Sequence, residues 1–510
     1  MSSKRFFIFA ALVLGNATVA LADAPLSAID WLSDTVATPV VMQPPAATDI
    51  TRDASVEDIT VTTLDGPTPD AVGLLPVSVT GLPRNFWGAT PSEELAELVR
   101  RQPVQSLPAL EDLLKMILLA ELDAPLDADG TGALFLARID KLLDMGSLDQ
   151  AQALLERAGP DTPDLFRRWF DVALLTGTEH AACAKLKDKA DIAPTYPARV
   201  FCLARNGDWS AAAVTLETAK VLGHITKEED ALLARFLDPE LFEGQPPLPR
   251  PKHVTPLVFR MREAIGEPIP TASLPLAFAN ADLRSNTGWK TQIEAAERLA
   301  RTGAIDPNRL LGIYTERLPA ASGGIWERVE AVQQFDTAMS TNDPGAVAAA
   351  LPVVWQEMQR AHLEVPFATL YGERLERLPL HDEAAELAFH IGLLSADYEK
   401  VAGNFKPVTV MDKFLVALAQ GDVNGVASPD AKGNVVKPAF QANTAPVEFA
   451  PLLADNQLGK AILQAITLFA QGADGDLKDV RKALLLLRSV GLEDTARRAA
   501  LQLMLLERRG

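Results

Sequence analysis

The chain has 510 residues, a formal net charge of -19 at pH 7 and 48% hydrophobic residues. A chain of this length exceeds what one hydrophobic core usually supports, so it must form several domains or one elongated array. Its acidity disfavours binding to nucleic-acid phosphates and to anionic lipid surfaces, because both depend on lysine and arginine. We therefore expect no nucleic-acid partner.

The first residues predict export from the cytoplasm. Lys4 and Arg5 precede an apolar run over residues 6–14, and an A-x-A pattern ends at Ala22. These features are typical of a secretory signal peptide, here residues 1–22, cleaved between Ala22 and Asp23. The alternative is an uncleaved anchor, although the run is shorter than the roughly 20 residues that span a bilayer. No long charge-free apolar stretch follows, so we expect a periplasmic protein without stable membrane insertion after cleavage.

Residues 23–89 predict an extended arm. They are rich in proline, threonine, aspartate and valine, a composition that disfavours a long helix. Hydrophobicity alternates over residues 59–61 and 75–79, and Asp65-Gly66 supplies a turn, so one small β-hairpin is expected. Such a segment buries too little apolar surface to stand alone. It packs on the helical body, stays partly disordered or docks onto a partner.

A first array of helical repeats is expected over residues 90–242. Thr90, Pro91 and Glu93 match a capping box with proline at the first helical position. Further along, a glycine recurs after 31 and then 30 residues, each followed five residues later by alanine and nine residues later by leucine. The glycine permits a tight turn, the alanine lets two helices approach and the leucine fills the core. The repeated residues are Gly146, Ala151 and Leu155; Gly177, Ala182 and Leu186; Gly207, Ala212 and Leu216; and, less completely, Gly491, Ala496 and Ala500.

This pattern resembles the tetratricopeptide-like α/α superhelices, well over about residues 132–240 and loosely over 285–508. The full consensus is not reproduced and the period is shorter, so the resemblance concerns architecture. It implies an all-α fold, an α/α superhelix or solenoid. Residues 72–76 and 81–83, with Phe86-Trp87, also resemble an uncharacterised family of exported bacterial proteins, and that resemblance implies no known activity.

A proline-rich stretch over residues 243–284 predicts a joint between two arrays. Its prolines prevent a long helix and leave room for a short one from about Leu257 to Ile265. A second array is expected over residues 285–510, with helices opening at Asp306-Pro307 and Asp343-Pro344. Residues 404–445 contain glycine, asparagine, lysine and proline and are expected to form an irregular insert.

Two cysteines, Cys183 and Cys202, lie 19 residues apart in neighbouring expected helices. A disulfide between them would close a short loop and contribute on the order of 3 kcal/mol. The alternatives are two buried thiols or a redox pair, although a redox pair usually has C-x-x-C spacing. A structural disulfide is the favoured interpretation, and it suits an oxidising compartment.

We find no pattern for catalysis, for cofactor binding or for a metal. The six histidines form no H-E-x-x-H or H-x-x-x-H pair, and His381 and His390 are nine residues apart, the wrong spacing for one helix face. Asp127 and Asp129 resemble the start of a calcium loop, but its twelfth position is Arg138 instead of glutamate. Nucleophile-elbow, Walker and dinucleotide-binding motifs do not occur in the sequence. We expect no enzyme, although carboxylates brought together by folding would escape this search.

The favoured function is a non-catalytic periplasmic scaffold or adaptor that binds protein partners in a cell-envelope machine. An arm followed by a superhelix is similar in layout to periplasmic scaffold proteins of flagellar motors and secretion systems. The alternative is a peptidoglycan-associated protein similar to the superhelical part of lytic transglycosylases, without their catalytic domain, because the Glu-Ser pair of that domain is absent. Tryptophans exposed on a concave face would be the best contact residues, but core packing is the default for each. They are Trp169, Trp209, Trp289, Trp326 and Trp355.

Overall fold

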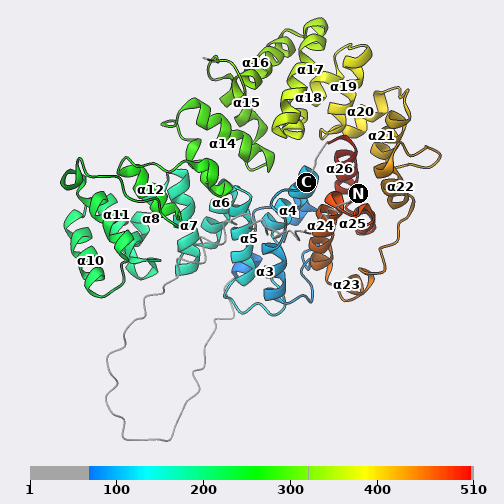
Figure 1. Ribbon diagram of the computed structural model, residues 1–510. Coiled ribbons are helices and arrows are strands. Elements are labelled where there is room, and N and C mark those ends of the chain that lie inside the picture. Colours follow the sequence, from blue (N-terminus) through cyan, green and yellow to red (C-terminus); the bar gives the residue numbers. More distant parts are fainter. Residues whose placement is uncertain (1–67, 320, 507–510) are drawn as a thin grey trace, which may run out of the picture.

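The computed structural model describes residues 68–319 and 321–506, and every regular element in these residues is a helix (Figure 1). The expected all-α superhelical fold is therefore confirmed. In this part of the chain, β-pairing is limited to an isolated parallel bridge between Leu75 and Ala120. Helices that follow one another in sequence pack against one another, as in stacked helical hairpins.

The described end of the expected arm contains two short helical turns, η1 (Pro69–Ala71) and α2 (Val77–Thr80). Residues 75–79, where alternation predicted a strand, therefore differ from expectation. Pro76 precedes α2, and Gly81 ends it with a left-handed φ of 67° while its N–H donates to the carbonyl of Val77. These two residues favour a helical turn over an extended strand. The turn expected at Asp65-Gly66, like the signal peptide and its cleavage between Ala22 and Asp23, lies outside the described residues.

Helices from Ser92 to Phe242 fall within the range given to the first array. Its elements are α3 (Ser92–Arg100), α4 (Pro108–Leu119), α5 (Ala133–Asp144), α6 (Leu148–Ala158), α7 (Pro163–Thr176), α8 (Glu179–Asp188), η2 (Ala190–Ile192), α9 (Tyr196–Arg205), α10 (Trp209–Val221), α11 (Lys227–Leu237) and η3 (Pro239–Phe242). The repeated alanines and leucines are all buried, and the glycines at the turns have left-handed φ angles, 75° at Gly146 and 86° at Gly207. A left-handed residue after a helix is most easily glycine, so the repeat has its expected structural cause.

The start of α3 differs from the expected capping box. The helix begins at Ser92, and Pro91 occupies the cap position without a side-chain hydrogen bond. The carboxylate of Asp127 accepts the backbone N–H of Ser92 at 2.9 Å and its hydroxyl at 2.7 Å. Asp127, from the calcium-like sequence, therefore caps α3 from another part of the chain.

The proline-rich joint packs back on the first array. It contains α12 (Pro256–Ala264), η4 (Thr271–Ser273), η5 (Leu276–Phe278) and α13 (Ala279–Asp282). The expected short helix is present as α12, which Thr255 caps by accepting the N–H of Val258. Both α12 and α13 contact α7, and α12 also contacts α11. The joint therefore packs against the helices of the first array and is not a free linker between the arrays.

The second array is mostly helical, and two of its helices fall within the stretch that was expected to be irregular. Its elements are α14 (Trp289–Arg301), α15 (Pro307–Thr315), α16 (Ile325–Thr341), α17 (Pro344–Ala361), α18 (Glu364–Glu376), α19 (Asp382–Leu393), α20 (Tyr398–Asn404), α21 (Val410–Gln420), α22 (Ala431–Gln441), α23 (Ala450–Ala454), α24 (Leu458–Asp474), α25 (Leu477–Ser489) and α26 (Glu493–Leu505). Residues 404–445 contain α21 and α22, each with a buried apolar face and an N-cap from Thr409 or Asp430. Burial of these faces outweighs the helix-breaking composition, even with Pro438 inside α22.

The second array starts and ends on neighbouring helices of the first array, α5 and α4. At its start, the hydroxyl of Thr302 donates to the carbonyl of Met145 at 2.9 Å, which joins the end of α14 to the end of α5. At its end, Gln502 of α26 accepts the N–H of Ala109 of α4 at 2.9 Å. Helices α14 to α22 arch over α4 and α5, and α26 returns beside α4 (Figure 1).

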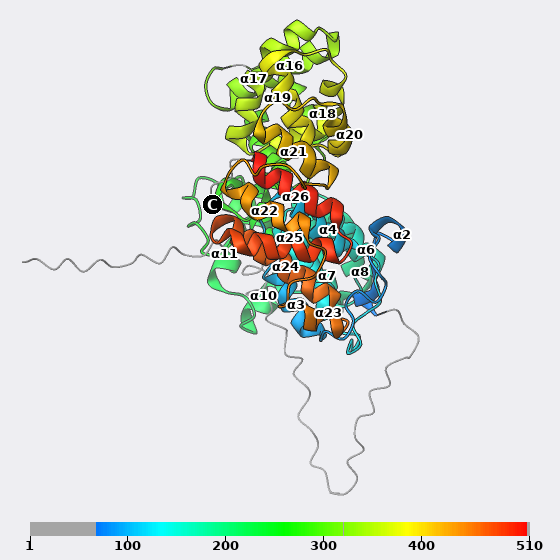
Figure 2. The same ribbon diagram turned by 90° about the vertical axis from the view of Figure 1, so that its right-hand side faces the viewer.

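The turned view shows the same closure, with α26 between α21 and α25 and close to α4 (Figure 2). Charged pairs support it, because Lys460 of α24 contacts Glu94 of α3 at 2.6 Å and Arg498 contacts Asp112 at 3.4 Å. The second array thus forms a closed loop of helices, whereas α8 to α11 extend away from it.

Candidate functional site

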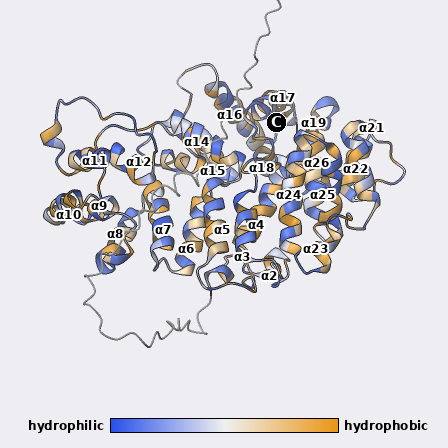
Figure 3. Cartoon of the chain, turned by 60° about the horizontal axis from the view of Figure 1, so that its bottom comes forward, coloured by the Kyte–Doolittle hydropathy of each residue, from blue (hydrophilic) through white to orange (hydrophobic). Residues whose placement is uncertain are grey.

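The extended end of the first array carries exposed apolar side chains. Helices α10 and α11 lie at one end of the molecule (Figure 3), and α10 packs on α9 and α11 through its small inner residues. On α10 and just after its end, Val221 is 87% exposed, Val214 67%, Leu222 57% and Trp209 51%. Val214 and Val221 are seven residues apart and share one side of the helix, whereas Trp209 lies at its start, next to Phe236. We call these four residues the α10 face. A terminal repeat usually has a polar outer face, so an apolar one points to a binding surface.

A groove of about 460 Å³ lies between α11 and the proline-rich joint. We call it the α11 groove. Its lining is mostly apolar, with Leu232 of α11, Leu248 of the joint and Val258 of α12 in its wall. Charged residues of both signs also line it: the basic Lys227, Arg250 and Lys252 and the acidic Glu228 and Glu229. Apolar walls with a few polar groups are the usual features of a ligand-binding groove.

Two arginines hold the proline-rich wall of this groove in place. Arg262 donates to the carbonyls of Leu248 and Pro249, and Arg235 donates to the carbonyl of Pro246 at 2.9 Å. Glu267 bridges the two guanidinium groups, at 3.0 Å from Arg235 and 2.7 Å from Arg262. Proline has no N–H to form a backbone ladder, so the carbonyls of this segment take side-chain donors instead.

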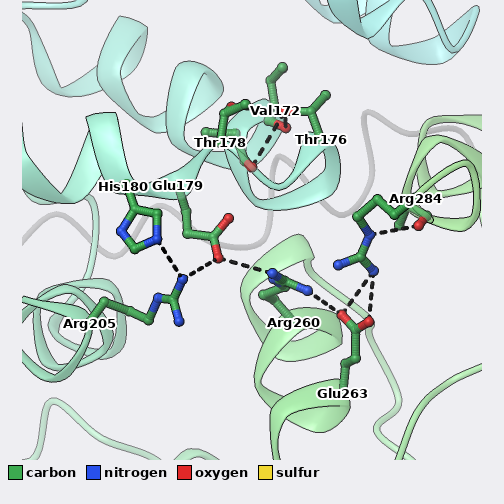
Figure 4. A network of polar contacts seen from close by, with 11 residues as sticks. Val172, Thr176, Thr178, Glu179, His180, Arg205, Arg260, Glu263 and Arg284 are labelled. Atoms are coloured by element: carbon green, nitrogen blue, oxygen red, sulfur yellow. Dashed lines mark hydrogen bonds and ion pairs between the residues drawn. The ribbon is translucent and has the colours of Figure 1, made fainter. Parts of the chain in front are cut away.

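The joint itself is fixed to the first array by a network of charges (Figure 4). Glu179 of α8 is buried and accepts from Arg205 of α9 and from Arg260 of α12, each at 3.1 Å. Arg260 also pairs with Glu263 of α12, which accepts from Arg284 at 2.8 Å. The network joins α8, α9 and α12 and the chain after α13. It keeps α12, and with it one wall of the groove, in a set position.

Electrostatics within this network favour the charged forms. Burial raises the pKa of Glu263, but hydrogen bonds from Arg284 and Arg260 outweigh burial and lower the pKa below its usual range. Burial lowers the pKa of Arg260, but the nearby charge of Glu179 and its own hydrogen bonds raise it overall. Glu263 and Arg260 are therefore ionised at neutral pH.

The predicted disulfide is present. Cys183 of α8 and Cys202 of α9 are bonded with a Cα–Cα distance of 4.8 Å, and both are buried. The bond joins two consecutive helices next to α10, which stabilises the end of the array that carries the α10 face. Its stabilisation, on the order of 3 kcal/mol, comes mainly from restricting the unfolded chain.

The five tryptophans separate into core and surface residues. Trp169, Trp289 and Trp355 are buried, and Trp326 is partly buried and packs on Trp289. Trp209 is half exposed, at the start of α10. One sequence signal could have identified this helix: valines occur on sides of α10 that its buried Ala212, Leu216 and Ala219 do not use. A helix that is apolar on more than one side usually packs against a second apolar surface in addition to the core.

One cluster with metal-ligand chemistry comes together on folding. Glu386 and His390 are four residues apart on α19, and Asp412 lies at the start of α21. One ligand atom from each lies within 4.8 Å of the others. The search for histidine pairs missed this cluster because one ligand comes from a different helix. The spacing E-x-x-x-H places two ligands on one face and was the available signal.

No protein-family model, curated protein or solved structure matches this chain. Among residues 68–319 and 321–506, no helix is both long enough and apolar enough to cross a membrane. The function is therefore inferred from the α10 face, the α11 groove and the helices that hold them.

Proposed function

We propose that this chain is a non-catalytic scaffold or adaptor that works in the periplasm and binds protein partners of a cell-envelope machine. The observation that carries the proposal is the α10 face, an apolar surface at the extended end of a helical solenoid, with the α11 groove close by. Solenoids of stacked helices commonly bind protein segments along such surfaces. A machine for motility or for envelope assembly is the favoured setting.

The disulfide between Cys183 and Cys202 supports the compartment. Disulfides persist in the periplasm and are rare in the cytosol. The expected signal peptide over residues 1–22 leads to the same compartment.

The groove favours a partner of particular chemistry. Its apolar wall suits an extended segment with alternate apolar side chains. In the lining, the exposed basic residues Lys227, Arg250 and Lys252 outnumber the acidic Glu228 and Glu229. This balance suits acidic residues in that segment, since opposite charges favour encounter and fix orientation. We infer an extended acidic and apolar protein segment as the ligand, with the α10 face providing further apolar contact.

The test is a crosslinking pull-down of the exported, tagged chain, with the partners quantified by mass spectrometry. A double variant, Val214→Glu with Val221→Glu, places two charges on the α10 face. The matched control is Val353→Glu, because Val353 is 55% exposed on α17, far along the chain from α10. We expect the wild type and the control to recover the same envelope proteins, and the double variant to lose them.

Two results would oppose the proposal. Recovery of the same proteins by all three forms would mean that the α10 face does not bind them. Recovery of cell-wall fragments without protein partners would favour the alternative, a peptidoglycan-associated protein.

A further inference from the structure

Three ligand-type side chains converge between α19 and α21 in the second array. The Nε2 atom of His390 lies 3.1 Å from Oδ1 of Asp412, and Glu386 completes the group within 4.8 Å. Asp412 is buried, His390 is half-buried and Glu386 is exposed, so the cluster opens to solvent on one side. The cluster is distant in sequence from the α11 groove and has no part in the proposed protein contact.

The charge of the cluster is unbalanced. With histidine neutral, two carboxylates give a local charge of about -2. Glu386 forms no hydrogen bond or ion pair with any of the described residues, and Oδ1 of Asp412 contacts Nε2 of His390 at 3.1 Å. A divalent cation would neutralise this charge.

The distances suit a transition metal. Metal–ligand bonds of about 2.1 Å in tetrahedral geometry place the ligand atoms about 3.4 Å apart. The His390–Asp412 distance of 3.1 Å is already close to that value, and Glu386, as an exposed side chain, can close the remaining gap by changing rotamer. An imidazole among the ligands favours zinc and its neighbours over calcium or magnesium.

We propose that Glu386, His390 and Asp412 form a binding site for a divalent transition-metal ion, with zinc as the best fit. Three protein ligands leave a fourth position for water. Thr409 provides the outer support, because its N–H donates to the other carboxylate oxygen of Asp412 at 3.3 Å and its hydroxyl accepts the N–H of Asp412. The ion joins α19 to α21 and so stiffens the arch of the second array.

The test is a calorimetric titration of the full exported chain with zinc. The protein is purified with an affinity tag that contains no histidine and is treated with a chelator beforehand. Wild type is expected to bind one equivalent of Zn²⁺. Glu386→Gln and His390→Gln are expected to weaken binding at least tenfold. Glu383→Gln is the matched control, because Glu383 is exposed on the same helix and is not part of the cluster. It is expected to bind zinc as wild type does.

A second measurement separates loss of the site from loss of the fold. Zinc is expected to raise the melting temperature of wild type and of Glu383→Gln, and to leave that of Glu386→Gln unchanged. Glu386 is exposed and forms no hydrogen bond or ion pair with the described residues, so we expect its variant to keep the fold and the test to stay decisive. Absence of stoichiometric binding by wild type, or equal binding by all four forms, would overturn the proposal.

Discussion

Buried charges decide how the first array responds to pH. Asp171 lies on α7, is 8% exposed and has Arg167 one turn before it on the same helix. The neighbouring Arg168 is occupied by Asp140, with contacts of 2.6 and 2.9 Å. Burial raises the pKa of Asp171 to about 7, although the charges of Arg167 and Arg168 oppose the rise.

Because its pKa is higher in the folded chain than in the unfolded chain, Asp171 makes the folded state less stable as the pH rises. The unfolded chain releases the proton near the ordinary value of 3.8, whereas the folded chain holds it to about 7. The contribution of Asp171 to stability is therefore fully present below about pH 4 and is lost as the pH rises to about 7. We expect Asp171→Asn, which does not titrate, to gain about 2 to 3 kcal/mol relative to wild type between pH 5 and pH 8.

The measurement is urea unfolding of both forms at several pH values in this range. The comparison with the variant removes the pH effects of the other carboxylates, which both forms share. Asp188→Asn, at an exposed site on α8, controls for loss of an acidic residue. A difference between wild type and Asp171→Asn that stays constant with pH would show that Asp171 is ionised in the folded chain.

Residues 72–87, the segment that resembles an exported family, connect helices of the two arrays. Gly73 lies so close to α4 that a Cβ atom on it would be 2.3 Å from the carbonyl oxygen of Ala120. Phe86 and Trp87 are buried, and the carbonyl of Phe86 accepts the N–H of Gly459 of α24 at 2.9 Å. The segment therefore joins the start of the first array to the end of the second.

Gly459 offers a direct test of this joint. A Cβ atom on it would lie 2.7 Å from the ring of Trp87 and 2.9 Å from that of Phe86. We expect Gly459→Ala to lower the free energy of unfolding by about 1 to 3 kcal/mol, because two buried rings must shift. Gly312→Ala, in α15 with open space around it, is expected to raise stability by about 0.5 to 1 kcal/mol through helix propensity. Thermal or urea unfolding gives both values, and equal effects would refute the close contact.

Local sequence signals predicted the local features of these elements. Asp306 and Asp343 cap helices that start with proline, and Gly491 ends a helix with a φ of 88°, as expected. The local signals failed where a residue far away in the sequence determines the start or the existence of a helix. Asp127 caps α3 across the chain, and α21 and α22 form because the second array buries their apolar faces.

The same limit applies to the sites. The disulfide followed from spacing and neighbouring helices, but Glu386 and Asp412 come together through the packing of the second array. The α10 face could have been recognised from apolar residues on several sides of one helix, whereas the α11 groove depends on how the joint folds back. Spacing within one helix is visible in a sequence, and contact between helices is not.

The second array closes on α4 and α5 and makes no use of the other end of the first array, α8 to α11. Gln502, which is 1% exposed, caps α4 from α26, and Lys115 of α4 donates to the carbonyl of Gly303 after α14. Both ends of the second array are thus occupied by contacts within the chain. The α10 face lies at the end that this closure does not use, and the helices against which α10 packs, α9 and α11, belong to the first array.

The most direct test of this account places a photo-crosslinking amino acid at Val221 in the exported protein, with Val353 as the matched exposed position on α17. The account predicts that the probe at Val221 crosslinks to one or a few envelope proteins in living cells, and that excess Val214→Glu protein does not compete with the crosslink whereas excess wild type does. Crosslinks of equal yield to the same proteins from both positions, or none from Val221, would contradict a partner-binding role for the α10 face.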